Sequence, residues 1–371
     1  MIKRNGMIDF MRVVYSLVIV MLHSVYLTTE KTRYLFPNGY LAVEAFFIIS
    51  GFLMFAEANE CSRGGALDRG KETAKFLICK YKRIFPYFLF GWILAFGVMC
   101  MDTSLTFQQI AKNVILSIWQ ILFMDMAGMD GYLMTGATWY LSSMFLVMPV
   151  MFWLLLNEKN FFSTVGTGLI PVFIYGYLQK RAGAPLEVYA WNHFFYLGTL
   201  RAVAGLSLGC FCFKLYKELI TICPTKLLRC ILTFIERGGY VATLFLMARP
   251  YSGANPFSFI TVLIFSICIT ISFSSLSFTA GFFSIKKPGN YRMVKCLGPF
   301  STALYLSHGR MQAFVIRAFP HLTTFAERFP RYLLFSILFG ICNLLFTYTW
   351  TVLFNKYGEK LKRMLVYESS K

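Results

Sequence analysis

Long runs of apolar residues, separated by short polar stretches, recur along the chain. A helix that crosses a bilayer needs about 20 consecutive apolar residues, and most of these runs are of that length. The runs lie at 7–28, 39–57, 84–101, 138–156, 161–179, 193–213, 238–250, 257–280, 297–317 and 331–354. The short run at 238–250 is expected to begin earlier, near Cys230. The pattern predicts an all-α integral membrane protein, with about ten transmembrane helices in a single domain over residues 1–371.

The segment 107–135 departs from this pattern. It is apolar over 114–126 but is interrupted by residues that disfavour a span: Asp125, Gly128, Asp130 and Gly131. Lysine and arginine collect in the cytoplasmic loops of membrane proteins, and most of the 36 in this chain fall on one side only if this segment does not cross. We therefore expect a re-entrant or interfacial segment on the outer face, with both chain termini in the cytoplasm.

Composition excludes several other classes of protein. The chain is 57% hydrophobic and 14% charged, whereas a soluble domain carries about 25% charged residues, so an ordinary cytosolic globule or a disordered chain is excluded. The net charge of +19 would suggest nucleic acid in a soluble protein, but basic cytoplasmic loops explain it here and no nucleic-acid partner is expected. The ten cysteines include no Cys-x-x-Cys pair, and we expect neither a disulfide framework nor a metal site.

The first apolar run contains three ionisable residues, Asp9, Arg12 and His23. Helical periodicity places all three on one face, and a rise of about 1.5 Å per residue puts His23 about 16 Å beyond Arg12. Ionisable side chains are costly in hydrocarbon, so each is a candidate for function. Structural alternatives stay open: a hydrogen bond between helices for His23, a snorkelling charge for Arg12 and a simple ion-pair partner for Asp9.

A second candidate group lies at the inner end of the third predicted span. Lys80 and Arg83 stand three residues apart, close to Tyr87. Two cations on one helix face suit a phosphate-bearing ligand such as coenzyme A. The alternative is a pair of basic anchors that touch lipid head groups.

Polar and aromatic residues in other spans are candidates for substrate binding. They are Glu44, Trp139, Tyr140, Arg201, Tyr305 and His308. An ion pair with another span is the structural alternative for Glu44, and the interfacial aromatic belt is the alternative for Trp139. Ser50 and Gly51 indicate close helix packing rather than chemistry.

Taken in order, these residues resemble the motifs of the acyltransferase 3 family of multispanning membrane acyltransferases. Arg12 and His23 reproduce that family's Arg-x10-His spacing, and residues 80–87 are similar to its Arg-x2-Arg-Ile-x-Pro motif. The other matching stretches are Phe-Phe-x-x-Ser-Gly within 43–52, Tyr-Leu-Ser-His at 305–308 and, more weakly, Trp-Tyr-Leu-Ser at 139–142.

The chain also departs from the family pattern. Lys80 stands where the family usually has an arginine, which removes bidentate phosphate binding at that position. Met144 stands where many members have a glutamate. We expect a member without a fused periplasmic hydrolase-like domain, so the acceptor would be delivered by the membrane domain itself or by a partner protein.

The resemblance implies transfer of an acyl group, most often acetyl, from cytoplasmic acyl-CoA to a hydroxyl of a cell-surface or lipid-linked glycan at a bacterial-type plasma membrane. The catalytic residues implied are His23, Arg12 and Asp9, and the donor-binding residues are Lys80, Arg83 and Tyr87. Histidine, with an ordinary pKa near 6.5, suits a general base, and Arg12 would orient the donor or stabilise charge on the thioester oxygen. Covalent or direct transfer stays open, as does a homodimer or a partner acyl-delivery protein.

Two other functional classes compete with an enzyme. One is a transporter or flippase for a glycan or small solute, in which the column from Arg12 to His23 is the path. The other is a membrane ligand-binding module. Binding of coenzyme A is the property that only the enzyme requires.

Overall fold

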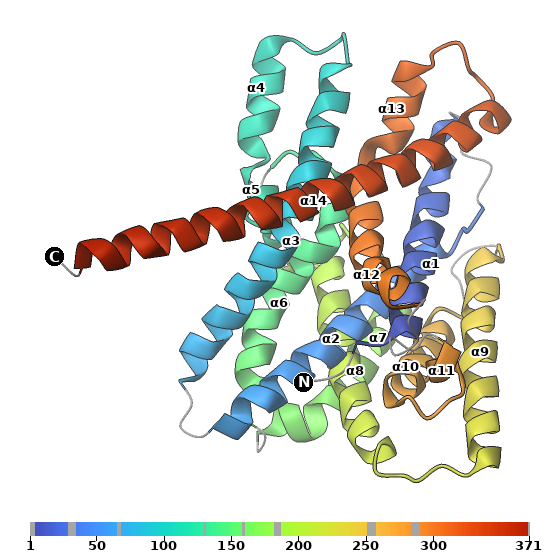
Figure 1. Cartoon of the computed structure of the whole chain (residues 1–371). Coiled ribbons are helices and arrows are strands. Elements are labelled where there is room, and N and C mark those ends of the chain that lie inside the picture. Colours follow the sequence, from blue (N-terminus) through green and yellow to red (C-terminus); the bar gives the residue numbers. More distant parts are fainter. Residues whose placement is uncertain are drawn as a thin grey trace.

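The computed structural model of the chain is built almost entirely from helices (Figure 1). It describes residues 4–28, 35–64, 68–129, 131–157, 160–181, 187–250, 257–282 and 290–369. The longer helices are α1 (Gly6–His23), α2 (Ala42–Cys61), α3 (Arg69–Cys100), α4 (Phe107–Leu116), α6 (Trp139–Leu155), α7 (Thr167–Lys180), α8 (Leu197–Leu219), α9 (Lys226–Ala248), α10 (Ser258–Ser274), α12 (Asn290–Ser307), α13 (Met311–Ala318) and α14 (Phe325–Ser369).

Short elements connect these helices. The helical turns are η1 (Ser24–Leu27), η2 (Gly39–Leu41), η3 (Ser62–Gly64), α5 (Ile118–Ile121), η4 (Asp125–Ala127), η5 (Gly136–Thr138), η6 (Phe162–Gly166), α11 (Thr279–Phe282) and η7 (His308–Arg310). In the described part of the chain, the strands are β1 (Trp191–Asn192) and β2 (Phe195–Tyr196), which form one antiparallel hairpin.

The predicted all-α membrane fold is confirmed. Within the described residues, six helical segments are long and apolar enough to cross a bilayer: Gly6–Leu27, Gly39–Cys61, Arg69–Cys100, Leu197–Leu219, Lys226–Ala248 and Phe325–Phe354. Two shorter helices, α6 and α10, are also apolar. The expected start of a span near Cys230 is confirmed by α9. The total of about ten spans stays a prediction.

Two predicted apolar runs are divided in the structure. The run at 193–213 begins in the β1–β2 hairpin, and its helix, α8, starts at Leu197. The run at 297–317 is not one helix, because η7 separates α12 from α13. At that break the Arg310 side chain donates to the backbone carbonyls of Met134 and Leu133, both at 2.7 Å. These bonds tie the break to the segment that precedes α6.

The segment 107–135 forms no single spanning helix. Its first part, α4, lies beside the last turns of α3 (Figure 1). The chain then passes Trp92, which donates to Ser117 Oγ at 3.2 Å, and reaches Tyr81, which donates to the Ile121 carbonyl at 3.0 Å. It turns back at Phe123, a buried residue with a φ of 54°. This folded-back path fits the expected re-entrant or interfacial segment, which is called the re-entrant segment below; its depth in the membrane stays a prediction, and Asp130 lies outside the described residues.

Glycines bring α2 and α8 into backbone contact. A Cβ atom built on Gly51 would lie 2.1 Å from the Leu206 carbonyl oxygen, and one built on Gly209 would lie 2.1 Å from the Ile48 carbonyl oxygen. The neighbouring atoms belong to helix backbones and cannot rotate away. The close packing expected at Ser50 and Gly51 is therefore confirmed for Gly51, whereas the Ser50 hydroxyl lies 3.0 Å from that of Tyr140.

Alanine at Gly209 is expected to destabilise the protein by about 1–3 kcal/mol, because α2 and α8 must separate to admit the methyl group. Gly97 in α3 is the matched control, since a Cβ there would have no neighbour within 4 Å. Thermal unfolding of the detergent-purified Gly209→Ala and Gly97→Ala variants measures the difference. A Gly209→Ala melting temperature equal to that of Gly97→Ala would contradict the close approach.

Candidate active site

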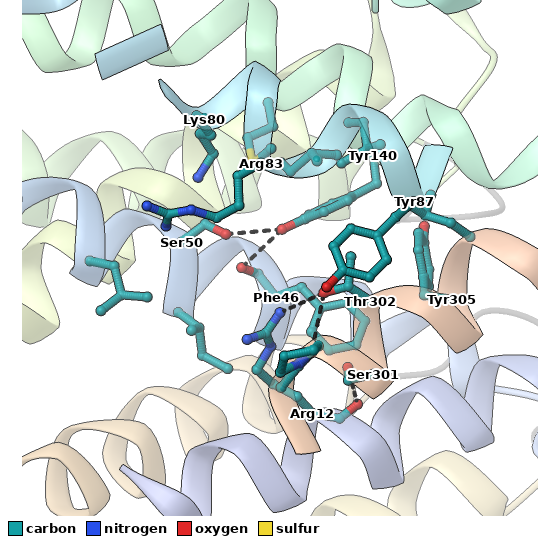
Figure 2. A pocket seen from close by; sticks show the side chains of 18 of the residues that line it. Arg12, Phe46, Ser50, Lys80, Arg83, Tyr87, Tyr140, Ser301, Thr302 and Tyr305 are labelled. Atoms are coloured by element: carbon teal, nitrogen blue, oxygen red, sulfur yellow. Dashed lines mark hydrogen bonds between the residues drawn. The ribbon is translucent and has the colours of Figure 1, made fainter. Parts of the chain in front are cut away.

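A cavity of about 410 Å³ lies between α1, α2, α3, α6 and α12. Its polar lining is dominated by four basic residues and three tyrosines: Arg4, Arg12, Lys80, Arg83, Tyr87, Tyr140 and Tyr305. The cavity has an exposed basic end and a buried aromatic end, because the Arg4 side chain is 35% exposed whereas Tyr305 is 6% exposed. Lys80 and Arg83 enter it from α3, and Arg12 enters from α1 on the opposite side (Figure 2).

The Arg12 guanidinium is held in place by two neighbours. Its Nη1 lies 3.5 Å from Asp9 Oδ1, and its Nη2 donates to Thr302 Oγ1 at 3.2 Å. Asp9 also pairs with Arg4 at 2.5 Å. The Asp9 carboxylate packs against Gly298, because a Cβ atom built on that glycine would lie 2.5 Å from Asp9 Oδ1. Asp9 therefore fixes Arg12 in the cavity wall, as an ion-pair partner rather than as an isolated charge.

Lys80 and Arg83 are available to a ligand. Both line the cavity, one helical turn apart on α3. Neither forms an ion pair with any carboxylate of the described ranges. The Lys80 ammonium group instead contacts an aromatic ring, since its Nζ lies 5.8 Å from the Phe76 ring centroid. A charge-assisted bond to a phosphate would satisfy both side chains.

Two tyrosines close the aromatic end of the cavity. The Tyr140 hydroxyl donates to the Phe46 carbonyl at 3.2 Å and lies 3.0 Å from Ser50 Oγ. The ring centroids of Tyr140 and Tyr305 are 6.0 Å apart. Tyr305 in turn lies 5.6 Å from the ring of His308, so it connects the cavity to the interior of the helix bundle.

His23 and His308 form a pair beyond Tyr305. Their ring centroids are 5.0 Å apart, although the two residues lie on α1 and η7. His23 Nδ1 is 2.8 Å from the Ile19 carbonyl, and His308 Nδ1 is 2.6 Å from the Tyr305 carbonyl. A carbonyl oxygen only accepts, so each Nδ1 carries the hydrogen and each neutral ring keeps its Nε2 lone pair. Neither imidazole is among the described residues that line the cavity.

Three predicted substrate-binding residues lie together, apart from the cavity. Arg201 Nε donates to Glu44 Oε1 at 2.7 Å in a fully buried pair, and the Arg201 guanidinium lies 4.8 Å from the Trp139 ring centroid. Tyr175 donates to Glu44 Oε2 at 2.6 Å. The structural alternative for Glu44, an ion pair with another span, is thus present. Their role in substrate binding stays a prediction.

The structure adds residues that the sequence did not single out. Arg4 and Thr302 line the cavity and contact Asp9 and Arg12 respectively, and Tyr175 completes the buried cluster around Glu44. Arg4 could have been singled out from the sequence, because it lies close to Asp9 along the chain, just before the same helix. No local pattern marks Thr302 or Tyr175, which become important only through contacts between distant helices.

Comparison with known proteins identifies the chain at the family level. Searches of curated proteins and of solved structures give no significant match. The family described as an acyltransferase domain, acyltransferase 3, matches residues 5–357, which include every cavity-lining residue named above except Arg4. The chain therefore belongs to the acyltransferase 3 family of membrane acyltransferases.

Proposed function

We propose that the protein transfers an acyl group, most simply acetyl, from cytoplasmic acyl-CoA to a hydroxyl of a cell-surface or lipid-linked glycan. One observation carries this proposal: the basic cavity ends at Tyr305, and the same ring contacts the buried imidazole of His308, which pairs with His23. A phosphate-bearing donor bound in the cavity and a general base, His23, would therefore lie along one continuous path through the protein.

The exposed end of the cavity supports binding of the donor phosphates. Four basic side chains line the cavity, and Asp9 is the one carboxylate among the described residues that line it. Arginine binds phosphate oxygens through a planar fork and lysine binds them as a point charge. Arg83 and Lys80 would hold the phosphates, while Arg12, fixed by Asp9 and Thr302, would orient the arm of the donor that leads to its thioester.

The buried end supports the chemical step. In that step His23 Nε2 removes the proton from the acceptor hydroxyl, and the hydroxyl oxygen bonds to the thioester carbonyl carbon. The carbon–sulfur bond then breaks, and the proton taken by the imidazole passes to the departing thiolate. His23 is suited to this because its Nδ1 hydrogen is already engaged by Ile19, which leaves Nε2 as the acceptor.

Charge distribution supports the orientation of this path. The start of α3 is rich in basic residues, and these include Arg69, Lys71, Lys75 and Lys82 beside Lys80 and Arg83. Basic residues mark the cytoplasmic side of a membrane protein. The cavity would then open to cytoplasmic acyl-CoA, and the other end of the path would face the acceptor outside.

The test is incorporation of label from [14C]acetyl-CoA into alkali-labile material. Membranes of the source cells that lack the chain are compared with membranes that contain it, because these membranes supply the native acceptor. We expect incorporation that depends on the chain, together with coenzyme A binding by the purified protein in calorimetry. Folded protein that neither binds coenzyme A nor supports incorporation would refute the proposal.

A further inference from the structure

We propose that the Asp125 carboxylate binds a hydroxyl group of the acceptor, next to the His23–His308 pair and beyond the aromatic end of the basic cavity. This inference rests on the proposed function. It assigns a ligand contact to the tip of the re-entrant segment, and it specifies that the acceptor is a hydroxyl-rich molecule such as a saccharide.

The tip of the re-entrant segment is rigidly placed. Phe123 is 1% exposed, and its ring lies 5.1 Å from Phe88 and 5.0 Å from Phe145. Two residues later, Asp125 begins η4, and the Met126 backbone N–H donates to Ser142 Oγ at 2.8 Å. Asp125 is thus held against the first turns of α6 by contacts on both sides of it.

One oxygen of the Asp125 carboxylate lacks a donor. Oδ2 accepts a weak bond from Thr138 Oγ1 at 3.3 Å and the Ser142 hydroxyl also interacts with the carboxylate, whereas Oδ1 is buried and forms no hydrogen bond of its own to a described residue. No lysine, arginine or histidine of the described ranges forms an ion pair with this carboxylate. An ionised carboxylate is an acceptor with no hydrogen of its own, so what it lacks is a donor such as a hydroxyl.

Asp125 is connected to the proposed reaction centre through η5. Its partner Thr138 belongs to η5, and η5 packs against η7, the turn that begins with His308. Thr138 is two residues before Tyr140 on the α6 side, and His308 is three residues after Tyr305 on the α12 side. Because Tyr140 and Tyr305 close the cavity, Thr138 and His308 both stand just beyond that closure.

The other side of Asp125 faces the β1–β2 hairpin, which favours a saccharide as ligand. Strand β2 packs against η4, and the hairpin residue Trp191 covers the tip so closely that a Cβ on Gly128 would lie 2.8 Å from its Cη2 atom. Trp191 and Tyr189 are each 46% exposed. Aromatic faces next to a hydroxyl-accepting carboxylate match the apolar and polar faces of a sugar ring.

Two substitutions separate ligand binding from support of the tip. Asp125→Asn removes the charge at constant size, and Thr138→Val removes one internal partner of the same carboxylate. If the carboxylate binds an acceptor hydroxyl, Asp125→Asn should lower acyl incorporation in source-cell membranes roughly tenfold to a hundredfold. Thr138→Val should lower it at most about fivefold, because the bond that it removes is long, at 3.3 Å, and therefore weak. Coenzyme A affinity of both purified variants should equal that of the unsubstituted protein.

The outcomes that overturn the inference are distinct. Incorporation by Asp125→Asn at the unsubstituted level excludes acceptor binding by this carboxylate. An equal loss in Thr138→Val and Asp125→Asn assigns the carboxylate to support of the tip, and so does a lowered coenzyme A affinity or melting temperature in Asp125→Asn. Failure of the unsubstituted chain to bind coenzyme A and support incorporation would instead refute the proposed function, and the inference with it.

Discussion

Replacement of His23 by alanine is expected to lower acyl transfer about 10²–10⁴-fold, which is the usual contribution of a general base. The physical reason is the fixed tautomer of this imidazole: Nδ1–H is directed to the Ile19 carbonyl at 2.8 Å, so the basic Nε2 lies on the opposite edge of the ring. Incorporation of label from [14C]acetyl-CoA into alkali-labile material of source-cell membranes measures the loss.

A second substitution at the same position distinguishes a base from a structural hydrogen bond. Asparagine places an amide N–H near the position of Nδ1, so His23→Asn can keep the bond to Ile19 while it lacks Nε2. If His23 is the base, both variants are inactive, and both bind coenzyme A normally because His23 does not line the described cavity. His321→Ala, at an exposed residue, is the control. Activity restored by asparagine would show that His23 serves only to hold the helix.

Much of the fold and part of the site could be predicted from local sequence. Apolar runs identified the helical membrane fold because a helix that lies in lipid must be apolar, however it packs against the other helices. Arg12, Lys80 and Arg83 were predicted to belong to one function, and all three line one cavity. Their shared position could be anticipated because a charge near the end of an apolar helix has few environments open to it, whereas their function stays a prediction.

Contacts between distant segments could not be predicted in the same way. His23 and His308 were both singled out, but nothing local indicates that rings 285 residues apart in the sequence lie 5.0 Å from each other. The tip at Asp125 was identified only as a break in an apolar run, and its orphaned oxygen depends on how η4 meets η5. Such features arise from the way the helices pack against one another, and the order of the helices along the chain does not specify that packing.

Removal of both cavity cations of α3 should weaken coenzyme A binding roughly 100-fold or more, because each charge-assisted hydrogen bond contributes about 1.5–3 kcal/mol. The variant is Lys80→Gln combined with Arg83→Gln, and the measurement is calorimetric titration of coenzyme A into the purified protein. Of the single variants, Arg83→Gln should account for the larger share, since arginine alone offers the planar fork. Lys80→Arg should retain or strengthen binding, because it supplies a second fork.

The control for this experiment lies on the same helix. Lys75 has a 69% exposed side chain, pairs with Glu72 at 3.6 Å and is not among the described residues that line the cavity. Lys75→Gln removes one positive charge from the same face of the membrane, so it reports the general effect of surface charge, which salt screens. If Lys80 and Arg83 merely anchor α3, the double variant will have a lower melting temperature, but its affinity for coenzyme A will equal that of Lys75→Gln. If they hold phosphates, affinity falls while the melting temperature does not, and added inorganic salt narrows the difference between the double variant and the control.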